Sequence, residues 1–270
     1  MRPAPFALHR PMTLADTLAA VAAGAQPLAG GQSLLPAMRL RDAEPGALVD
    51  LAGVDALDGD IRSAGERIRI GAHVTHAALA ADDAIRADQP WLADAAAQIG
   101  DVQVRNLGTV LGNVCWADPR ANMAVALLAS DATVIAAEAD GTRGVIPLGE
   151  FFSGFRRHVL GQRLAVALEL PRGAGARGCY LEFARQRQDL ALVNVCAVAH
   201  ANGLRIAVGG IDPTPVRLAA VETDGPGALE DALAPARHSP VADQHGDAAY
   251  KLHLAAVLVR RALAAIGIDA

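Results

Sequence analysis

A short apolar segment runs into two consecutive glycines near the N-terminus, in the order Pro27-Leu28-Ala29-Gly30-Gly31-Gln32-Ser33. The apolar residues favour a strand, and the glycines permit backbone angles that turn successive N–H groups into one concavity. The Ser33 hydroxyl adds a donor for a phosphate oxygen. The segment therefore predicts a phosphate-binding loop at the end of a strand. An ordinary glycine turn is the alternative, because paired glycines are common in loops.

A second glycine-containing segment covers Arg105 to Asn113 and is followed by Ala117-Asp118-Pro119-Arg120-Ala121-Asn122. It again combines small residues with hydrogen-bond donors. We expect it to be a loop that enters a helix over residues 120–128, whose N-terminal end carries a partial positive charge suited to an anion. A polar loop before a capped helix, with no ligand, is the alternative.

The order and separation of these two segments resemble the two flavin pyrophosphate motifs in the FAD-binding subunit of molybdenum hydroxylases, the family of xanthine dehydrogenase and aerobic CO dehydrogenase. That family has AGGHS or AGGQS in the first motif. Its second motif is of the Thr-Ile-Gly-Gly-Asn/Asp type, after a QVRN-like stretch that residues 103–106 match. The resemblance continues through PLAGGQSLLPAMRLR, LVDLAGVDAL, GAHVTHAAL, DPTPVR at 212–217 and HLAAVLVRRAL, and so covers nearly the whole chain.

This resemblance implies a cofactor, a fold and a set of site residues. FAD would lie between two α+β subdomains of a PCMH-type FAD-binding fold, and a C-terminal α+β domain would cover the isoalloxazine ring. The pyrophosphate would lie on the first motif, with the second motif closing the other side. The implied cofactor-binding residues are Ala29, Gly30, Gly31, Gln32, Ser33, Thr109, Gly112, Asn113, Asp118 and Asn122. Because the first motif lacks histidine, the flavin is expected to be non-covalent.

Four positions depart from the family pattern. Leu111 stands where a glycine usually adjoins Gly112, and it adds bulk where the backbone would approach phosphate. Asn122 replaces the usual acidic residue and removes a charged acceptor. Glu182 replaces a frequent lysine, and Leu190 replaces an aromatic residue found in many members. These positions bear on flavin affinity and on the choice of electron acceptor.

Hydrophobic periodicity predicts an α+β protein with domains at 1–52, 53–170 and 171–270. We expect helices at 14–21, 75–81, 91–99 and 120–128, and strands at 27–29, 47–51, 67–70, 133–137, 163–170, 179–183, 192–199 and 204–208. Leu164, Val166, Leu168 and Leu170 should share one face of their strand. Asn202-Gly203 predicts a hairpin turn. Leu252, Ala256, Val259, Leu263 and Ile266 form one stripe of a C-terminal helix, away from Arg260 and Arg261.

Composition excludes several function classes. A net charge of −5 leaves no basic face for nucleic acid. Lys251 is the only lysine, which makes Schiff-base chemistry improbable. The three cysteines, Cys115, Cys179 and Cys196, are too few for an iron–sulfur cluster and are expected to be reduced core thiols. No segment predicts a membrane span or a leader, so we expect a cytoplasmic protein.

Two further patterns are interpreted as structural. His73 and His76 bracket a turn, but no third metal ligand accompanies them, so surface or capping roles are favoured. Residues 173–178 spell GxGxxG, but a strand rather than a helix is expected next, which argues against a dinucleotide fingerprint.

The resemblance implies an electron-transfer role without a catalytic acid or base in this chain. A large subunit with a molybdenum-pterin cofactor would oxidise the substrate, and a small subunit with 2Fe-2S clusters would pass electrons to the FAD and on to an external acceptor. A hetero-oligomer such as a dimer of heterotrimers would result. Two alternatives remain: a stand-alone PCMH-type flavin oxidoreductase, against which the short third domain argues, and an assembly subunit without flavin, which Leu111 and Asn122 motivate.

Overall fold

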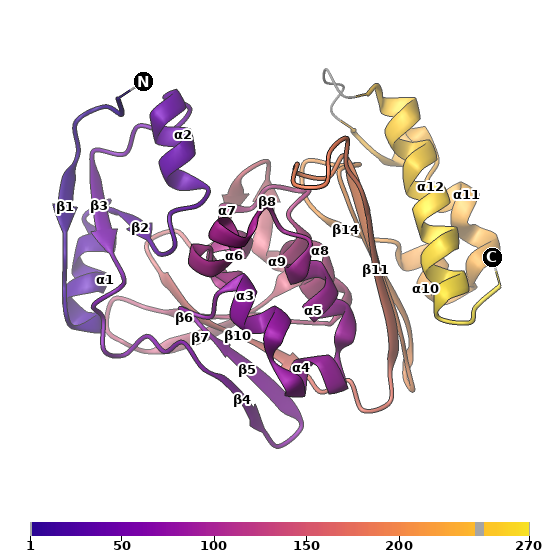
Figure 1. The fold of residues 1–270 in the computed structure, drawn as a ribbon, viewed down its shortest axis with the longest axis horizontal. Coiled ribbons are helices and arrows are strands. Elements are labelled where there is room, and N and C mark those ends of the chain that lie inside the picture. Colours follow the sequence, from indigo (N-terminus) through magenta and orange to yellow (C-terminus); the bar gives the residue numbers. More distant parts are fainter. Residues whose placement is uncertain (1, 241–245, 270) are drawn as a thin grey trace.

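The computed structural model describes residues 2–240 and 246–269, and its strands form three main sheets that lie side by side (Figure 1). The N-terminal sheet has the order β1 (Ala7–His9), β3 (Ala47–Asp50), β2 (Gln26–Leu28), with both pairs parallel. Its helices are α1 (Leu14–Ala22) and α2 (Leu34–Leu40). Thr13 caps α1 by accepting a hydrogen bond from the Asp16 N–H.

The central unit is built on a five-stranded antiparallel sheet. Its order is β4 (Ile61–Ala64), β5 (Arg67–Gly71), β10 (Leu164–Pro171), β6 (Thr133–Ala137), β7 (Arg143–Pro147). A small hairpin, β8 (Phe152–Gly154) and β9 (Arg157–His158), lies apart from this sheet. The helices are α3 (His76–Ala81), α4 (Asp83–Asp88), α5 (Pro90–Ala97), α6 (Val102–Leu107), α7 (Val110–Trp116), α8 (Asn122–Ala129) and α9 (Leu148–Phe151).

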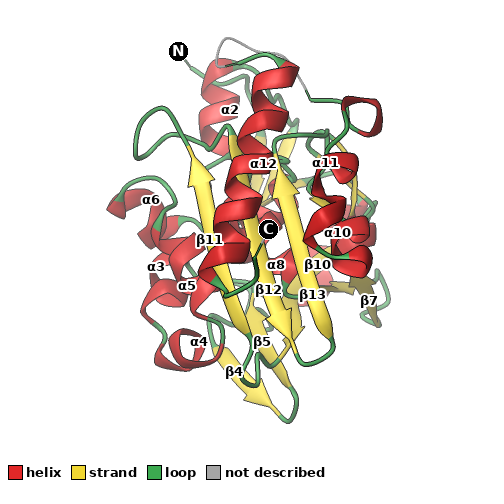
Figure 2. Cartoon of the chain, turned by 90° about the vertical axis from the view of Figure 1, so that its right-hand side faces the viewer, coloured by secondary structure: helices red, strands yellow, loops and turns green. Residues whose placement is uncertain are grey.

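The third unit is a four-stranded antiparallel sheet with helices on its outer face (Figure 2). The strands run β11 (Arg177–Phe183), β12 (Val193–His200), β13 (Gly203–Gly209), β14 (Val216–Arg217). The helices are α10 (Ala219–Asp224), α11 (Leu229–Ala232) and α12 (Ala248–Ala265), with single 3-10 turns at Pro226–Ala228 and Pro235–Arg237. The predicted apolar stripe of α12 is buried, while Arg260 and Arg261 are exposed, as expected.

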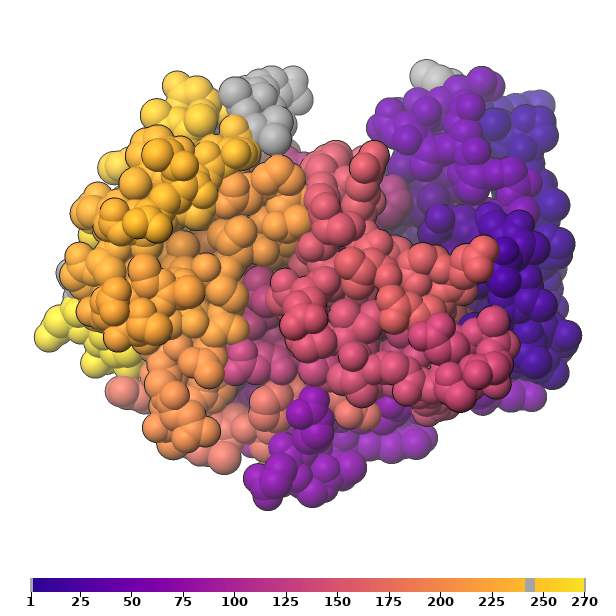
Figure 3. Space-filling view, turned by 180° about the vertical axis from the view of Figure 1, so that it is seen from behind, coloured from indigo at the N-terminus to yellow at the C-terminus, as the bar shows by residue number. Residues whose placement is uncertain are grey.

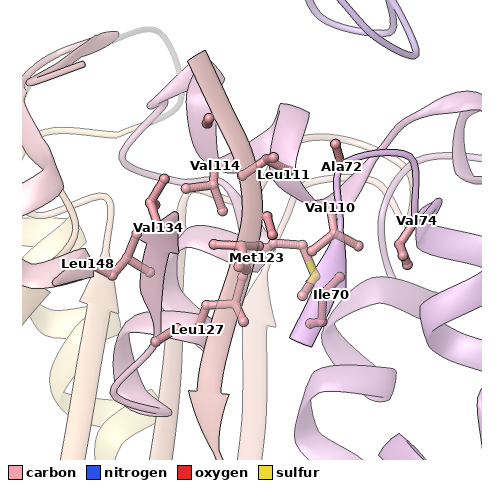
Figure 4. Close-up of a cluster of buried hydrophobic side chains, with 14 of the residues drawn as sticks. Ile70, Ala72, Val74, Val110, Leu111, Val114, Met123, Leu127, Val134 and Leu148 are labelled. Atoms are coloured by element: carbon pink, nitrogen blue, oxygen red, sulfur yellow. The ribbon is translucent and has the colours of Figure 1, made fainter. Parts of the chain in front are cut away.

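Two hydrophobic cores meet at this third sheet. Cys196 and Val198 of β12 face inward and belong to the large core that the N-terminal and central units share. Val195 and Ala197 face outward and pack with α10 to α12. Figure 4 shows part of the large core, where Met123 of α8 lies among Ile70, Val110 and Leu127. The domain boundaries expected from the sequence at residues 52 and 170 stay a prediction.

An ion-pair cluster holds the third unit against the central one. Asp131, between α8 and β6, accepts hydrogen bonds from Arg217 Nη1 at 2.7 Å and Arg205 Nε at 2.9 Å. Arg217 also contacts Glu222 through Nε at 2.5 Å and Nη2 at 2.7 Å. Arg217 is the last residue of the DPTPVR motif, so this motif contributes to fastening β14 to the central unit.

Several local expectations were wrong. The face shared by Leu164, Val166, Leu168 and Leu170 is interrupted, because the pairing with β6 skips Val166 in a β-bulge and the alternation shifts there. The hairpin between β12 and β13 is present, but its loop is Ala201-Asn202, with Gly203 already paired to His200.

Among the described residues, no helix is both long and apolar enough to cross a membrane.

Candidate functional site

The glycine loop between β2 and α2 presents a row of free donors. Gly31 has a φ of 71°, which turns the chain sharply. Within the described part of the chain, the backbone N–H groups of Gly30, Gly31, Gln32 and Ser33 donate no hydrogen bond to protein. The Gln32 side chain steadies the turn by donating from Nε2 to the Gly30 carbonyl at 3.0 Å. Four consecutive free N–H groups are the arrangement that an anion such as a phosphate requires.

The loop is in direct backbone contact with the junction of α6 and α7. A Cβ atom at Gly30 would lie 1.9 Å from the Leu107 carbonyl oxygen, so only glycine fits there. A Cβ at Gly108 would lie 2.9 Å from the Val104 carbonyl oxygen and 3.1 Å from His76 Cδ2. Two glycines from distant segments therefore let the two motifs of the sequence meet.

The second motif is helical, which corrects the expectation of a loop over residues 105–113. Residues 102–107 form α6, and Thr109 caps α7, its Oγ1 accepting a hydrogen bond from the Gly112 N–H at 3.1 Å. A Cβ at Gly112 would lie 2.6 Å from that same Oγ1, which explains the glycine. Leu111 is buried within α7 and packs in the large core beside Val110 and Val114 (Figure 4). Helical geometry at Leu111 makes no demand for glycine.

A cleft of about 350 Å³ lies between the N-terminal and central units, within the size range of small-molecule sites. Its lining includes eight of the ten residues implied by the resemblance, namely Ala29, Gly30, Gly31, Gln32, Ser33, Thr109, Gly112 and Asn113. The opposite wall comes from α1, from residues 158–165 and from Ile99. The sequence analysis did not single out these wall residues, which are mostly apolar but include His158 and Arg163, because only the packing of the units brings them to the cleft.

The other two implied residues, Asp118 and Asn122, lie outside this cleft. Asp118 borders a second, smaller hollow that shares Gln32, Ser33, Asn113 and Trp116 with the cleft. It is 2% exposed, and Arg120 Nε contacts its Oδ1 at 3.1 Å. Asn122 borders neither hollow.

Asn122 instead joins a buried polar network at the boundary with the third sheet. Its Nδ2 donates to Glu182 Oε2 at 2.7 Å, and the Tyr180 hydroxyl donates to the same oxygen at 3.0 Å. Asn194 Nδ2 in turn donates to the Tyr180 hydroxyl at 3.1 Å. Burial raises the pKa of Glu182, although the hydrogen bonds from Tyr180 and Asn122 oppose it. Two departures from the family pattern, Asn122 and Glu182, are therefore in direct contact.

His76 is a residue of the cleft that the sequence interpretation missed. It was expected at the surface or as a cap, but it is 3% exposed and lines the cleft as the first residue of α3. Burial, with a smaller contribution from the charge of Arg105, lowers its pKa to about 4. The imidazole is therefore neutral at pH 7. His73 is half-buried, and the described residues contain no group of three His, Cys, Asp or Glu side chains that could hold a metal ion.

The side chains present in the cleft fit a phosphate ester that carries hydroxyl groups. The free N–H row suits the phosphate, and the contact at Gly30 leaves the backbone bare for a close approach. Asn113 Oδ1 is buried without a hydrogen-bond partner and lines the same cleft, so it can accept a hydrogen bond from a sugar or ribityl hydroxyl. The apolar wall that includes Leu28, Ile99 and Leu160 suits an aromatic ring.

Comparison with known families matches the chain in two consecutive parts. Residues 4–173 match the FAD binding domain in molybdopterin dehydrogenase, and residues 178–266 match the CO dehydrogenase flavoprotein C-terminal domain.

Individual relatives agree with this match. The 6-hydroxypseudooxynicotine dehydrogenase complex subunit alpha of Paenarthrobacter nicotinovorans is 35% identical, covering 88% of this chain and 85% of that one. The carbon monoxide dehydrogenase medium chain of Hydrogenophaga pseudoflava is 32% identical over 97% of both chains. A solved structure of carbon monoxide dehydrogenase from Hydrogenophaga pseudoflava, lacking the Mo-pyranopterin moiety of its cofactor, superposes with a TM-score of 0.91, at 32% identity and 98% coverage of both chains.

Proposed function

The chain belongs to the family of FAD-binding subunits of molybdopterin dehydrogenases, and we propose that it carries electrons from 2Fe-2S clusters of a partner subunit to an external acceptor. It is a medium subunit of the molybdenum hydroxylase type and an oxidoreductase component. Bound FAD supplies the redox chemistry, while the protein supplies orientation and electrostatics.

One observation carries the cofactor part of this proposal, the row of free N–H groups from Gly30 to Ser33. In the proposed complex these groups hold the pyrophosphate, and the Thr109 to Asn113 segment closes the other side. Hydrogen bonds to a charged group are among the strongest that a neutral donor makes. Because Gly30 presses against Leu107, the first motif cannot shift without moving the second. The two motifs thus form one preorganised site.

The residues of the cleft bind and orient, and none is needed as an acid or base. His76 is neutral above a pH of about 4 and so brings no charge to the cleft. Leu111 is buried in the core and, as a residue of the helix α7, also lines the cleft. Asn122 donates to Glu182 and borders neither hollow. The assembly-only alternative is decided by whether the purified chain holds flavin.

The partner subunits are inferred from the family. We propose a large subunit with a molybdenum-pterin cofactor, a small subunit with 2Fe-2S clusters, and an assembly such as a dimer of heterotrimers. The relative with 35% identity is itself a subunit of a dehydrogenase complex. The three cysteines of this chain are free, with Cys196 buried and Cys115 and Cys179 half-buried. Three cysteines are too few for an iron–sulfur cluster, so the clusters are proposed for a partner subunit. A cytoplasmic location stays a prediction.

The first experiment is to purify the chain, record its visible spectrum and release the cofactor with acid. We expect a flavin band at one equivalent and FAD in the supernatant. A colourless protein that added FAD cannot reconstitute would refute flavin binding and leave the assembly role. Flavin with intrinsic dehydrogenase activity in the isolated chain would favour the stand-alone enzyme.

A second experiment tests the partners. The chain is co-expressed with the products of the genes adjacent to its own, and the assembly is measured by light scattering. We expect co-purification with an iron–sulfur protein and a molybdopterin protein. Stopped-flow mixing with a substrate that the molybdopterin protein oxidises should then reduce the flavin only in the full assembly. Flavin reduction without the iron–sulfur subunit would contradict the proposed electron path.

A further inference from the structure

The second hollow adjoins the proposed FAD cleft and has a volume of about 250 Å³. The hollow and the cleft share Gln32, Ser33, Asn113 and Trp116, so the N–H row proposed for the pyrophosphate stands where they meet. The outer walls of the hollow are α2 of the N-terminal unit and Leu190 of the third unit. Figure 3 shows the open notch between the N-terminal unit and the rest of the chain.

FAD has two arms on either side of its pyrophosphate, and the two hollows provide one space for each. The cleft is lined mainly by apolar residues of the N-terminal and central units, together with Arg163 and two histidines, and suits the adenosine arm. The second hollow reaches the third unit and the exposed side chain of Leu190, where a ring stays within reach of other molecules. Electron exchange with partners requires that access. On the proposed FAD site, the second hollow suits the redox-active ring.

A cation borders this hollow, the guanidinium of Arg156, whose side chain is 37% exposed. The Arg156 guanidinium carbon lies 4.9 Å from the centroid of the Trp116 ring and 5.0 Å from that of Phe155. Its Nη2 lies 3.6 Å from Oδ2 of the buried Asp118. Trp116 and Asp118 also border the hollow, so the three side chains form one wall of it.

The backbone of Arg156 is constrained as well. It has a φ of 53°, a region that residues with side chains seldom occupy, and its N–H donates to the Ala117 carbonyl at 3.1 Å. Unusual backbone conformations that are retained in this way cluster at functional sites.

The charges around the hollow leave a cation available for a ligand. The Asp118 carboxylate is already engaged by Arg120, whose N–H and Nε both donate to Oδ1 at 3.1 Å. Among the described residues, Asp42 is the other acidic side chain that borders the hollow. Asp42 and Arg156 are both exposed, so solvent weakens the charge of each. Arg156 and Arg120 outnumber the single buried carboxylate. The wall formed by Arg156 is thus electropositive.

We propose that Arg156 is the electrostatic partner of the flavin ring, a positively charged side chain that favours the reduced, more negative form of the cofactor. This inference rests on the proposed FAD site. A fixed positive charge beside a group that gains negative charge stabilises the product without further reorganisation. Arg156 would raise the flavin midpoint potential and help draw electrons into this chain.

The test uses the purified FAD-loaded chain, with the midpoint potential of the flavin and the dissociation constant of its sulfite adduct as readouts. Sulfite adds to the oxidised ring and makes it anionic, so its affinity reports positive charge nearby. We expect Arg156→Gln to weaken sulfite binding at least tenfold and to lower the potential by about 30 mV, the shift of a two-electron couple for a tenfold change. Arg156→Met, which keeps the aliphatic stem over Trp116, should behave alike and serves if the first variant fails to fold.

Two controls isolate the charge. Arg157→Gln removes the neighbouring exposed arginine, which borders neither hollow, and should leave both readouts unchanged. Arg156→Lys keeps the charge and should stay close to the wild type. Equal readouts in the wild type and Arg156→Gln, both with full FAD, would overturn the inference while leaving FAD binding intact. The inference would also be overturned if Arg156→Gln changed only the rate of electron transfer to the external acceptor and left both readouts unchanged. A wild type without FAD would instead refute the proposed function.

Discussion

Gly30→Ala is the sharpest test of how the two motifs interlock. The added Cβ would lie 1.9 Å from the Leu107 carbonyl oxygen and 2.9 Å from Gly108 Cα. A comfortable carbon–oxygen contact is about 3.3 Å, so the loop and the α6–α7 junction would have to separate by roughly 1.4 Å. Overpacking of this kind costs about 1–3 kcal/mol, and the upper end applies because the obstacle is backbone rather than a flexible side chain.

The same displacement would remove hydrogen bonds from the pyrophosphate. One bond to a charged group contributes about 1.5–3 kcal/mol, which corresponds to a roughly 10- to 150-fold weaker FAD affinity. Flavin fluorescence titration measures the affinity, and urea unfolding of the FAD-free chain measures the stability. Gly46→Ala is the matched control, since a Cβ there meets nothing within 4 Å. If Gly30→Ala matched Gly46→Ala in both assays, the two motifs would not be interlocked.

Three further outcomes follow from the contacts described above. His76 has a folded-state pKa of about 4 against an ordinary value of 6.5, so between these values the unfolded chain binds a proton that the folded chain excludes. The free energy of unfolding should therefore fall by up to about 3 kcal/mol as the pH decreases through this window. Urea unfolding at pH 7.5 and 4.5 should show a smaller loss of stability for His76→Gln than for the wild type, and an equal loss would argue against this role of His76. Thr109→Ala should cost about 1 kcal/mol through loss of the α7 cap, with Thr109→Ser retaining most of it, as thermal unfolding would reveal. Burial alone would raise the pKa of Asp131, but Arg217 and Arg205 lower it overall. The stabilising contribution of this carboxylate is therefore present above its unfolded pKa and is lost as the pH falls through the lower folded value. Asp131→Asn should cost about 1 kcal/mol of stability after solvent screening and speed proteolysis between the central and third units, whereas unchanged proteolysis would mean that the ion pairs do not hold the two units together.

Local chemistry in the sequence was sufficient for the regular elements and for the two motifs. The apolar stripe of α12 and the strands β12 and β13 follow from periodicity, which depends only on neighbouring residues. Asn202-Gly203 indicated the hairpin between these strands, although its loop lies one residue earlier. Gly31 and Gly30 were singled out because glycine alone combines backbone freedom with the absence of a Cβ. The resemblance then joined the segments around Ser33 and Thr109 into one site, and the structure brings them to the same cleft.

The remaining features depend on contacts between segments far apart in the chain, which no local pattern encodes. His76 is buried against Gly108, and Asn122 donates to Glu182, which also accepts a hydrogen bond from Tyr180. The wall of Arg156, Trp116 and Asp118 exists only where the α7–α8 connection meets the small hairpin of β8 and β9. Sequence by itself determined which residues can turn, cap and approach a phosphate, because those properties belong to single residues and their neighbours. Tertiary structure alone decided which charges are buried together, because burial and pairing are properties of packed surfaces.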